Sequence, residues 1–144
     1  MIQIMSTYGS LLLRAMGQTL LLALCGLLFG TLLGMIFGIL SVVKNKVCNV
    51  IAMVFVDVVR SVPMIVLAMF VFFGVPYCLN NMMGMGVTLT ALQAGTICLA
   101  LNCGAYMAEI IRAGIQSVDK GQMEAARSLG LPYWRAMQRV VLPQ

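Results

Sequence analysis

Residues 119–143, DKGQMEAARSLGLPYWRAMQRVVLP, form a polar block at the end of an otherwise apolar chain. Asp119 is a favourable helix N-cap, and Gln122 three positions later completes the spacing of a capping box. The residues from 120 to 129 are good helix formers, so a short helix is predicted to follow this cap. Gly130 would end it, because glycine readily takes the left-handed conformation that terminates many helices.

A second helix is predicted directly after this glycine. Pro132 is placed to open it, since proline is well tolerated in the first turn of a helix. The helix would run from 133 to about 142 and stop at Pro143, which cannot continue it. The local chemistry therefore predicts two short helices joined by a tight glycine turn, in a loop over residues 117–143.

The composition of the chain places this loop beside a membrane. Of the 144 residues, 62% are hydrophobic and only 9% are charged. A soluble domain of this size has no core large enough for so much apolar surface, whereas a lipid bilayer accommodates it. We therefore expect one all-α integral membrane domain over residues 1–144, with transmembrane helices at about 17–43, 50–75 and 87–111.

The second of these spans is interrupted by charge and by proline. A straight helix here would bury Asp57 and Arg60 in hydrocarbon, so we expect residues 48–60 to lie at the interface or against protein. The chain would bend near Pro63, and residues 62–73 would complete the crossing. Asp57 and Arg60 are three positions apart and can pair on a helix, either to fix the helix entrance or to take part in transport.

Two stripes of small residues predict close helix packing. In the first span glycine recurs at every fourth position, which places Gly26, Gly30, Gly34 and Gly38 on one face. Such a face lets another helix approach closely, and its strict register favours packing over the general abundance of glycine in membrane helices. In the third span a comparable face is formed by Ala100, Gly104 and Ala108.

The other side of the third span carries polar residues. Asn102, Tyr106 and Glu109 follow one another at helical spacing, and polar residues at membrane depth are candidates for a translocation pathway. Interhelical hydrogen bonding explains Asn102 equally well. Glu109 can pair with Arg112, which favours a structural role for it at the membrane edge.

Charges outside the spans predict the topology. Lys44, Asn45 and Lys46 follow the first span, and five of the nine Lys and Arg residues lie from Arg112 onward. Because positive charge concentrates on the cytoplasmic side, the N-terminus would lie outside, residues 74–86 would form an outer loop, and the polar block would be cytoplasmic. This reading accounts for the net charge of +5 better than nucleic-acid binding, for which no motif is present.

Common catalytic motifs are missing from the sequence. It contains no histidine, no GxxxxGK[ST] phosphate-binding loop and no GxSxG motif. Its five cysteines form no CxxC pair and mostly lie in apolar runs, where cysteine behaves as a small hydrophobe. We therefore expect a chain that is not an enzyme, holds no metal and binds no cofactor itself.

The spacing of residues within the polar block carries a family resemblance. The residues concerned are Glu124, Ala125, Ala126, Gly130, Val140, Val141, Leu142 and Pro143. This set closely resembles the EAA loop of ABC-importer permeases and departs from it only at Val140, where that family usually has isoleucine. Residues 104–117, GAYMAEIIRAGIQS, and 60–64, RSVPM, resemble the polar amino-acid uptake branch, with Ser and Val replacing a Gly-Thr pair. The resemblance covers roughly residues 17–144 and implies part of a MetI-like transmembrane fold.

The resemblance implies that the polar block is a coupling loop. In such permeases this loop is seated in a groove of a cytoplasmic ATPase subunit, and that subunit binds the ATP. The matching positions here are Gly121, Glu124, Ala125, Ala126, Gly130, Leu142 and Pro143. Paired alanines would permit close seating, Glu124 would offer a charge to a basic partner, and Gly130 would allow the turn.

The resemblance also implies an assembly and a function. The chain would be a permease subunit for polar amino acids in a prokaryotic cytoplasmic membrane, working by alternating access. Its partners would be a second permease subunit, in a homo- or heterodimer, and an extracytoplasmic amino-acid-binding protein. Related permeases continue with further membrane helices, so a fragment or shortened permease is expected. Two other hypotheses stay open: a non-transporting scaffold or assembly protein that binds helices through the glycine face, and a small channel.

Overall fold

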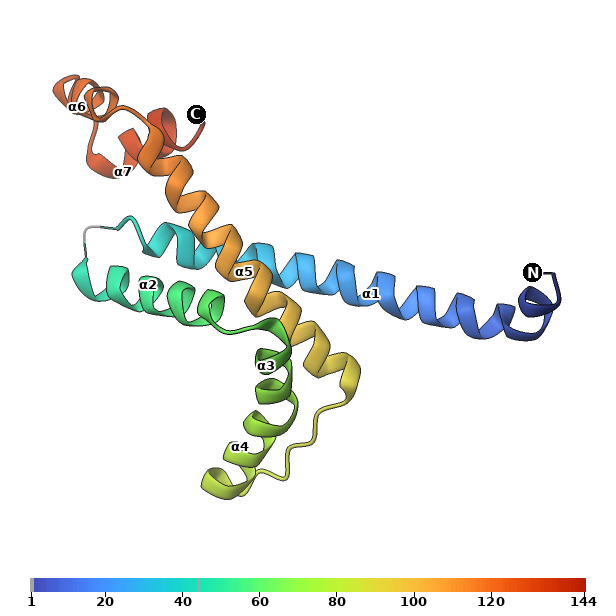
Figure 1. The fold of residues 1–144 in the computed structure, drawn as a ribbon. Helices are drawn as coiled ribbons and strands as arrows, with labels where there is room; N and C mark the ends of the chain where they lie inside the picture. Colours follow the sequence, from blue (N-terminus) through green and yellow to red (C-terminus); the bar gives the residue numbers. More distant parts are fainter. Residues whose placement is uncertain (1, 44) are drawn as a thin grey trace.

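The computed structural model describes residues 2–43 and 45–144, with side chains described from Tyr8 onward; Met1 and the predicted span-ending Lys44 lie outside the described residues. Its elements in order are α1 (Ile2–Leu40), α2 (Lys46–Ser61), α3 (Met64–Met69), the π-helical turn η1 (Phe70–Gly74), α4 (Val75–Met83), α5 (Ala91–Ser117), α6 (Lys120–Ser128), α7 (Tyr133–Ala136) and a second π-helical turn η2 (Met137–Val141) (Figure 1). The predicted all-helical class is confirmed for this part of the chain.

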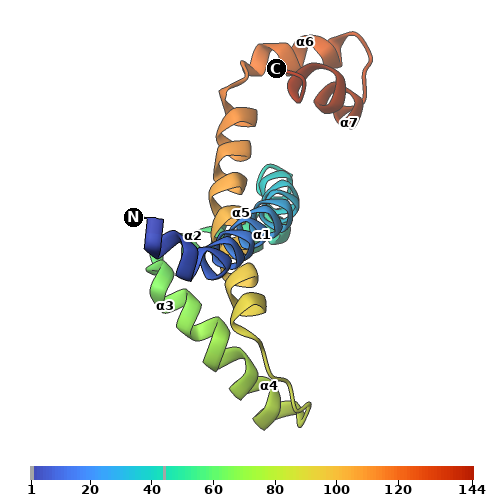
Figure 2. The same ribbon diagram turned by 90° about the vertical axis from the view of Figure 1, so that its right-hand side faces the viewer.

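Helix α5 is the central element of the arrangement. It is crossed by α1, whose N-terminal half extends well beyond the other helices (Figure 1). The α6–α7 pair lies at one end of α5, and α3 and α4 lie toward the other end (Figure 2). Three segments are long and apolar enough to cross a membrane by length and composition: Tyr8–Leu40, Met64–Met83 and Ala91–Ser117.

The second candidate span differs from the predicted one, 50–75. Helix α2 ends at Ser61, and Val62 has extended backbone angles, φ −90° and ψ 129°. The residue before a proline is excluded from the helical region by the proline ring, so the chain bends at Pro63, as expected. The apolar helix that follows starts at Met64 and continues to Met83 through η1, and α2 remains a separate helix.

The predicted outer loop over 74–86 is mostly helical, which corrects that expectation. The π-helical turn η1 ends at Gly74, and the helix continues as α4 with Pro76 in its first turn, where a proline must interrupt the regular hydrogen-bond ladder. The loop proper lies between α4 and α5. Asn80 holds it closed, because its side chain donates to the Val87 carbonyl at 2.9 Å and accepts from the Val87 N–H at 2.6 Å.

The third span begins and ends later than the predicted 87–111. Thr90 caps α5 in a capping box: its hydroxyl accepts from the Gln93 N–H at 3.3 Å, and the Gln93 side chain accepts from the Thr90 N–H at 3.0 Å. These two bonds satisfy N–H groups that have no partner inside the helix. At its other end α5 continues to Ser117, six residues beyond the predicted end at 111.

The largest helix contact joins α1 and α5. Every glycine of the α1 stripe lies directly against α5: Gly26 at Leu99, Gly30 at Cys103, Gly34 at Met107 and Gly38 at Ile111. A Cβ added to Gly30 would lie 2.7 Å from the Cβ of Cys103 and 3.3 Å from the Ala100 carbonyl oxygen. On α5 the facing residues Ala100, Gly104 and Ala108 are buried, so the two small-residue stripes meet each other.

A small apolar core joins α2 and α3 to α5. Its buried residues are Val59, Leu67, Val71, Ala94, Cys98 and Ala105. One turn before Val59 in α2, the ring of Phe55 packs against this core and stacks on Phe37 of α1 with ring centroids 4.0 Å apart. These contacts hold α2 against both long helices, and they fix the position of Arg60 in its last turn.

Candidate functional site

Helix α6 begins at the predicted cap. Asp119 accepts a hydrogen bond from the Gly121 N–H at 2.6 Å through its carboxylate. The predicted capping box with Gln122 does not form, because the Gln122 side chain accepts a hydrogen bond from the Gln144 side chain instead. Gln144 also donates to the Val140 carbonyl at 2.7 Å. The end of the described chain is thereby joined to the start of α6.

The turn after α6 is a Schellman motif at the predicted glycine. Gly130 has φ +83°, a conformation that L side chains rarely adopt. Its N–H donates to the Arg127 carbonyl at 3.0 Å, and the Leu131 N–H donates to the Ala126 carbonyl at 3.2 Å. Pro132 caps α7 rather than sitting inside it, and Tyr133 is the first helical residue. We call the unit from Asp119 to Val141 the hairpin.

The hairpin has a buried face and an exposed face. Its buried residues are Ala126, Ala136, Met137 and Val141. Glu124 and Ala125 are exposed, and the Leu129 side chain is 84% exposed. Adjacent alanines of the predicted docking set therefore point in different directions: Ala125 is available to another protein, whereas Ala126 packs inside the hairpin.

The remaining predicted coupling residues lie near the two ends of the hairpin. Gly121 is exposed in the first turn of α6, where its N–H bonds to Asp119. Leu142 and Pro143 are exposed just after η2. Leu142 retains an exposed fraction of 45%, so it also adds apolar surface to the outside of the unit.

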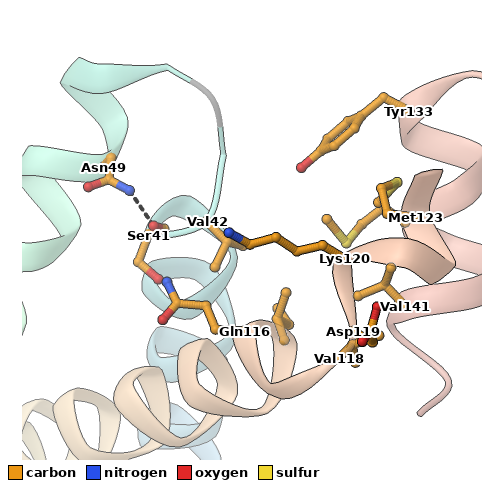
Figure 3. A pocket seen from close by; sticks show the side chains of 12 residues that line it. Ser41, Val42, Asn49, Gln116, Val118, Asp119, Lys120, Met123, Tyr133 and Val141 are labelled. Atoms are coloured by element: carbon orange, nitrogen blue, oxygen red, sulfur yellow. Dashed lines mark hydrogen bonds between the residues drawn. The ribbon is translucent and has the colours of Figure 1, made fainter.

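A pocket of about 560 Å³ separates the hairpin from the end of α1. The Lys120 side chain extends across it toward Val42, and Tyr133 points into it from α7 (Figure 3). On the far wall the Asn49 amide donates to the Ser41 carbonyl, and the Ser41 hydroxyl donates to the Gly38 carbonyl at 2.6 Å. The hairpin thus lies beside the junction of α1 and α2 as well as at the end of α5.

A second group of polar side chains lies where α2 meets α5. The Arg60 guanidinium is 3.7 Å from a Glu109 carboxylate oxygen, and Arg112 is 3.8 Å from the same oxygen. The guanidinium also lies over the Tyr106 ring, 5.1 Å from its centroid. We call Arg60, Tyr106, Glu109 and Arg112 the charged cluster.

Of the two ion pairs predicted around this cluster, the structure contains one and lacks the other. Among the described residues no ion pair joins Asp57 to Arg60, and Asp57 is exposed. Glu109 does pair with Arg112, as predicted. The Arg60–Glu109 pair was missed because the two residues are far apart in the sequence, and only the α2–α5 contact brings them together. Asn102 lies partly buried on α5, without a side-chain hydrogen bond to the described residues.

Residues 30–144 match the family described as binding-protein-dependent transport system inner membrane component. The match includes α5, the charged cluster and the whole hairpin. The chain belongs to this family. Membership in this family of inner membrane transport components agrees with the three apolar helices and with the absence of catalytic motifs from the sequence.

Named relatives of this inner membrane component family include permeases of amino-acid transport systems. The glutamine transport system permease GlnP of Rickettsia prowazekii is 40% identical over 101 residues, which are 70% of this chain and 44% of that protein. The arginine transport system permease ArtQ of Bacillus subtilis is 43% identical over 94 residues, 65% of this chain and 40% of that protein. The chain thus spans less than half the length of these curated relatives.

Solved structures show the same helix arrangement. A crystal structure of an amino acid ABC transporter with histidines superposes with a TM-score of 0.79 at 36% identity, over 97% of this chain and 62% of that one. The MetNI methionine ABC transporter in an inward-facing conformation gives a TM-score of 0.72 at 22% identity, over 96% of this chain and 64% of that one. The second likeness supports the fold alone.

Proposed function

We propose that this chain is a permease subunit, in whole or in part, of an ATP-binding-cassette importer for polar amino acids. The observation that carries the proposal is an exposed hairpin whose first helix, α6, follows the membrane helix α5 after only two residues, Val118 and Asp119. Family membership and the amino-acid permeases among its relatives support the substrate class. The chain itself would not hydrolyse ATP, which would be bound by a separate subunit.

The exposed face of the hairpin is the docking surface for that ATPase subunit. Glu124 and Ala125 lie outward together on α6 and offer a charge beside a small side chain. A small residue lets the helix backbone approach the partner closely, and the carboxylate can pair with a basic group there. Ala126 acts indirectly, by holding α6 against α7 and η2.

Movement of the hairpin would reach the membrane helices through rigid contacts. Helix α5 is packed against α1 along the glycine stripe so closely that a Cβ added to Gly30 would lie 3.3 Å from the Ala100 carbonyl oxygen. Close packing of this kind transmits a displacement instead of absorbing it. Closure of two ATPase subunits would therefore shift α5 and α1 together, and this shift would give alternating access to the substrate pathway.

The polar side of α5 is the candidate substrate pathway. Tyr106 is 49% exposed on the isolated chain, and Asn102 and Glu109 are partly exposed. Polar side chains at membrane depth need water or protein partners, which a pathway lined by a second permease subunit would supply. Substrate would be delivered by an extracytoplasmic amino-acid-binding protein on the side opposite the hairpin.

The structure argues against the scaffold hypothesis, because the surface that it requires is already occupied. It required the glycine stripe of α1 to be available to other membrane proteins. In the structure each glycine of the stripe faces a residue of α5 of the same chain. No comparable observation favours a channel.

The proposal requires the hairpin to be cytoplasmic and α4 to lie toward the exterior of a prokaryotic cytoplasmic membrane. Cys78 is an exposed residue of α4, and α4 lies at the end of the molecule away from the hairpin (Figure 2). In intact cells a membrane-impermeant maleimide should label Cys78 when the other four cysteines are replaced by serine. In a variant without native cysteines, Ala125→Cys should be labelled only after permeabilisation. Labelling of Ala125→Cys in intact cells would contradict the proposed orientation.

A further inference from the structure

The charged cluster has hydrogen-bonding groups that its internal contacts do not satisfy. Both arginines contact the same Glu109 oxygen, Oε2, at 3.7 and 3.8 Å. These separations are longer than hydrogen bonds, so each guanidinium keeps donors available. No hydrogen bond from the described residues reaches the Glu109 carboxylate beside these two ion pairs. The guanidinium groups therefore retain hydrogen-bond donors, and the Glu109 carboxylate retains the capacity to accept a hydrogen bond.

The cluster is held in place while staying accessible. The Arg60 side chain is 37% exposed and that of Glu109 is 38% exposed. The Arg60 guanidinium carbon lies 5.1 Å from the Tyr106 ring centroid, and this cation–π contact restrains the guanidinium. Buried Val59, next to Arg60 in α2, fixes the helix that carries it.

The location of the cluster argues for a polar occupant. Glu109 lies within the candidate membrane span Ala91–Ser117, where ionisable side chains are costly and are found facing water-filled cavities or one another. Arg60, Glu109 and Arg112 together carry a net charge of +1, since two cations surround one carboxylate. The internal pairing alone therefore leaves one positive charge uncompensated.

We propose that Arg60 and Glu109 form a subsite for the zwitterionic backbone of an α-amino acid. Arg60 would bind the α-carboxylate through its free donors, and Oε1 of Glu109 would accept from the α-ammonium. A cation and an anion 3.7 Å apart on one accessible face complement the two charges of an amino-acid zwitterion. The substrate side chain makes no contact with this pair. The inference rests on the proposed import of amino acids and names the part of the substrate that this site binds.

The test compares ligands that carry or lack one of the two charges. Equilibrium binding is measured on the permease–ATPase complex in lipid nanodiscs, without the binding protein, whose own selectivity would mask that of the permease. The probes are L-glutamine, its decarboxylated counterpart 4-aminobutanamide and its deaminated counterpart glutaramic acid. L-Arginine and agmatine form a second pair. Arg60→Gln should weaken binding of the L-amino acid roughly ten- to hundredfold, the range of a charged hydrogen bond, and leave the decarboxylated amine unchanged.

Two further variants separate ligand binding from a purely structural role. Glu109→Gln should weaken the binding of L-glutamine and leave the binding of glutaramic acid unchanged, because only the contact with the ammonium group is lost. Arg60→Lys retains a cation and should bind L-glutamine more tightly than Arg60→Gln does. The matched control is Asp57→Asn, an exposed carboxylate on the same helix outside the cluster, which should bind all probes as the wild type does.

The outcomes distinguish this site from the proposed function. If Arg60→Gln loses the same binding affinity for amino acids and for their decarboxylated counterparts, or loses none for either, the proposed subsite is wrong. The proposed import of amino acids would stand. A wild-type complex that binds neither L-glutamine nor L-arginine would contradict the substrate class itself, and the subsite with it.

Discussion

Replacement of Glu124 by lysine should abolish ATP-driven uptake and release the ATPase subunit from the membrane complex. Glu124 is exposed on α6, so reversing its charge leaves the buried residues of the hairpin in place. At the docking interface the new cation would face the basic group proposed to pair with the carboxylate. Loss of a charge pair at an interface typically costs about 2–5 kcal/mol, which corresponds to binding at least ~30-fold weaker. Copurification of the ATPase with tagged permease, together with uptake in vesicles, measures this loss.

A matched substitution separates docking from general changes in charge. Arg139 is also exposed, but lies on η2 and not on α6. Arg139→Gln should retain ATPase copurification close to that of the wild type, and Glu124→Gln should fall between the wild type and Glu124→Lys. Wild-type copurification in Glu124→Lys would contradict the proposed docking surface.

Replacement of Gly34 by leucine should prevent assembly of the membrane core. A Cβ at this position would overlap the Cβ of Met107 and lie 3.1 Å from the Gly104 carbonyl oxygen and 3.3 Å from the Ala108 nitrogen. Two of these neighbours are backbone atoms of α5, which cannot move aside as a flexible side chain can. Forcing a side chain into such a contact would destabilise the α1–α5 pair by about 3 kcal/mol or more.

The measurement is the fraction of detergent-solubilised protein that stays monodisperse after heating, compared across variants. Gly17 supplies the control, since it lies on the same helix and a Cβ there would have nothing within 4 Å. Gly17→Leu should behave like the wild type. If Gly34→Leu and Gly17→Leu tolerate heat equally, the glycine stripe is not a packing surface.

Local chemistry was sufficient to predict the hairpin from the sequence. Asp119 and Gly130 act through hydrogen bonds to residues no more than five positions away, so their roles are written in short stretches of sequence. The capping box at Thr90 and Gln93 has the same short range and could have been recognised from its Thr-x-x-Gln spacing. Recognising it would have placed the start of α5 correctly.

Features that depend on distant contacts were not predictable in this way. The neighbour three positions from Arg60 is Asp57, but packing of α2 on α5 presents Glu109 instead. Residues 74–86 were expected to form a loop, yet a π-helical turn comes just before Pro76 and the helix continues, while Asn80 bonds to Val87 across the following turn. The exposure of Ala125 and the burial of Ala126 likewise depend on the packing of α6 on α7 and η2.

Contact between the outward face of α6 and an ATPase subunit can be tested directly at two adjacent alanines. A photo-activatable cross-linker is introduced at position 125 or at position 126 of the permease in the assembled transporter, and captured proteins are identified after irradiation. Ala125 is exposed, whereas Ala126 is 5% exposed. We expect capture of the ATPase subunit from position 125 and little or none from position 126. Failure to capture the ATPase from position 125 in an assembled, ATP-hydrolysing complex would contradict the proposed contact.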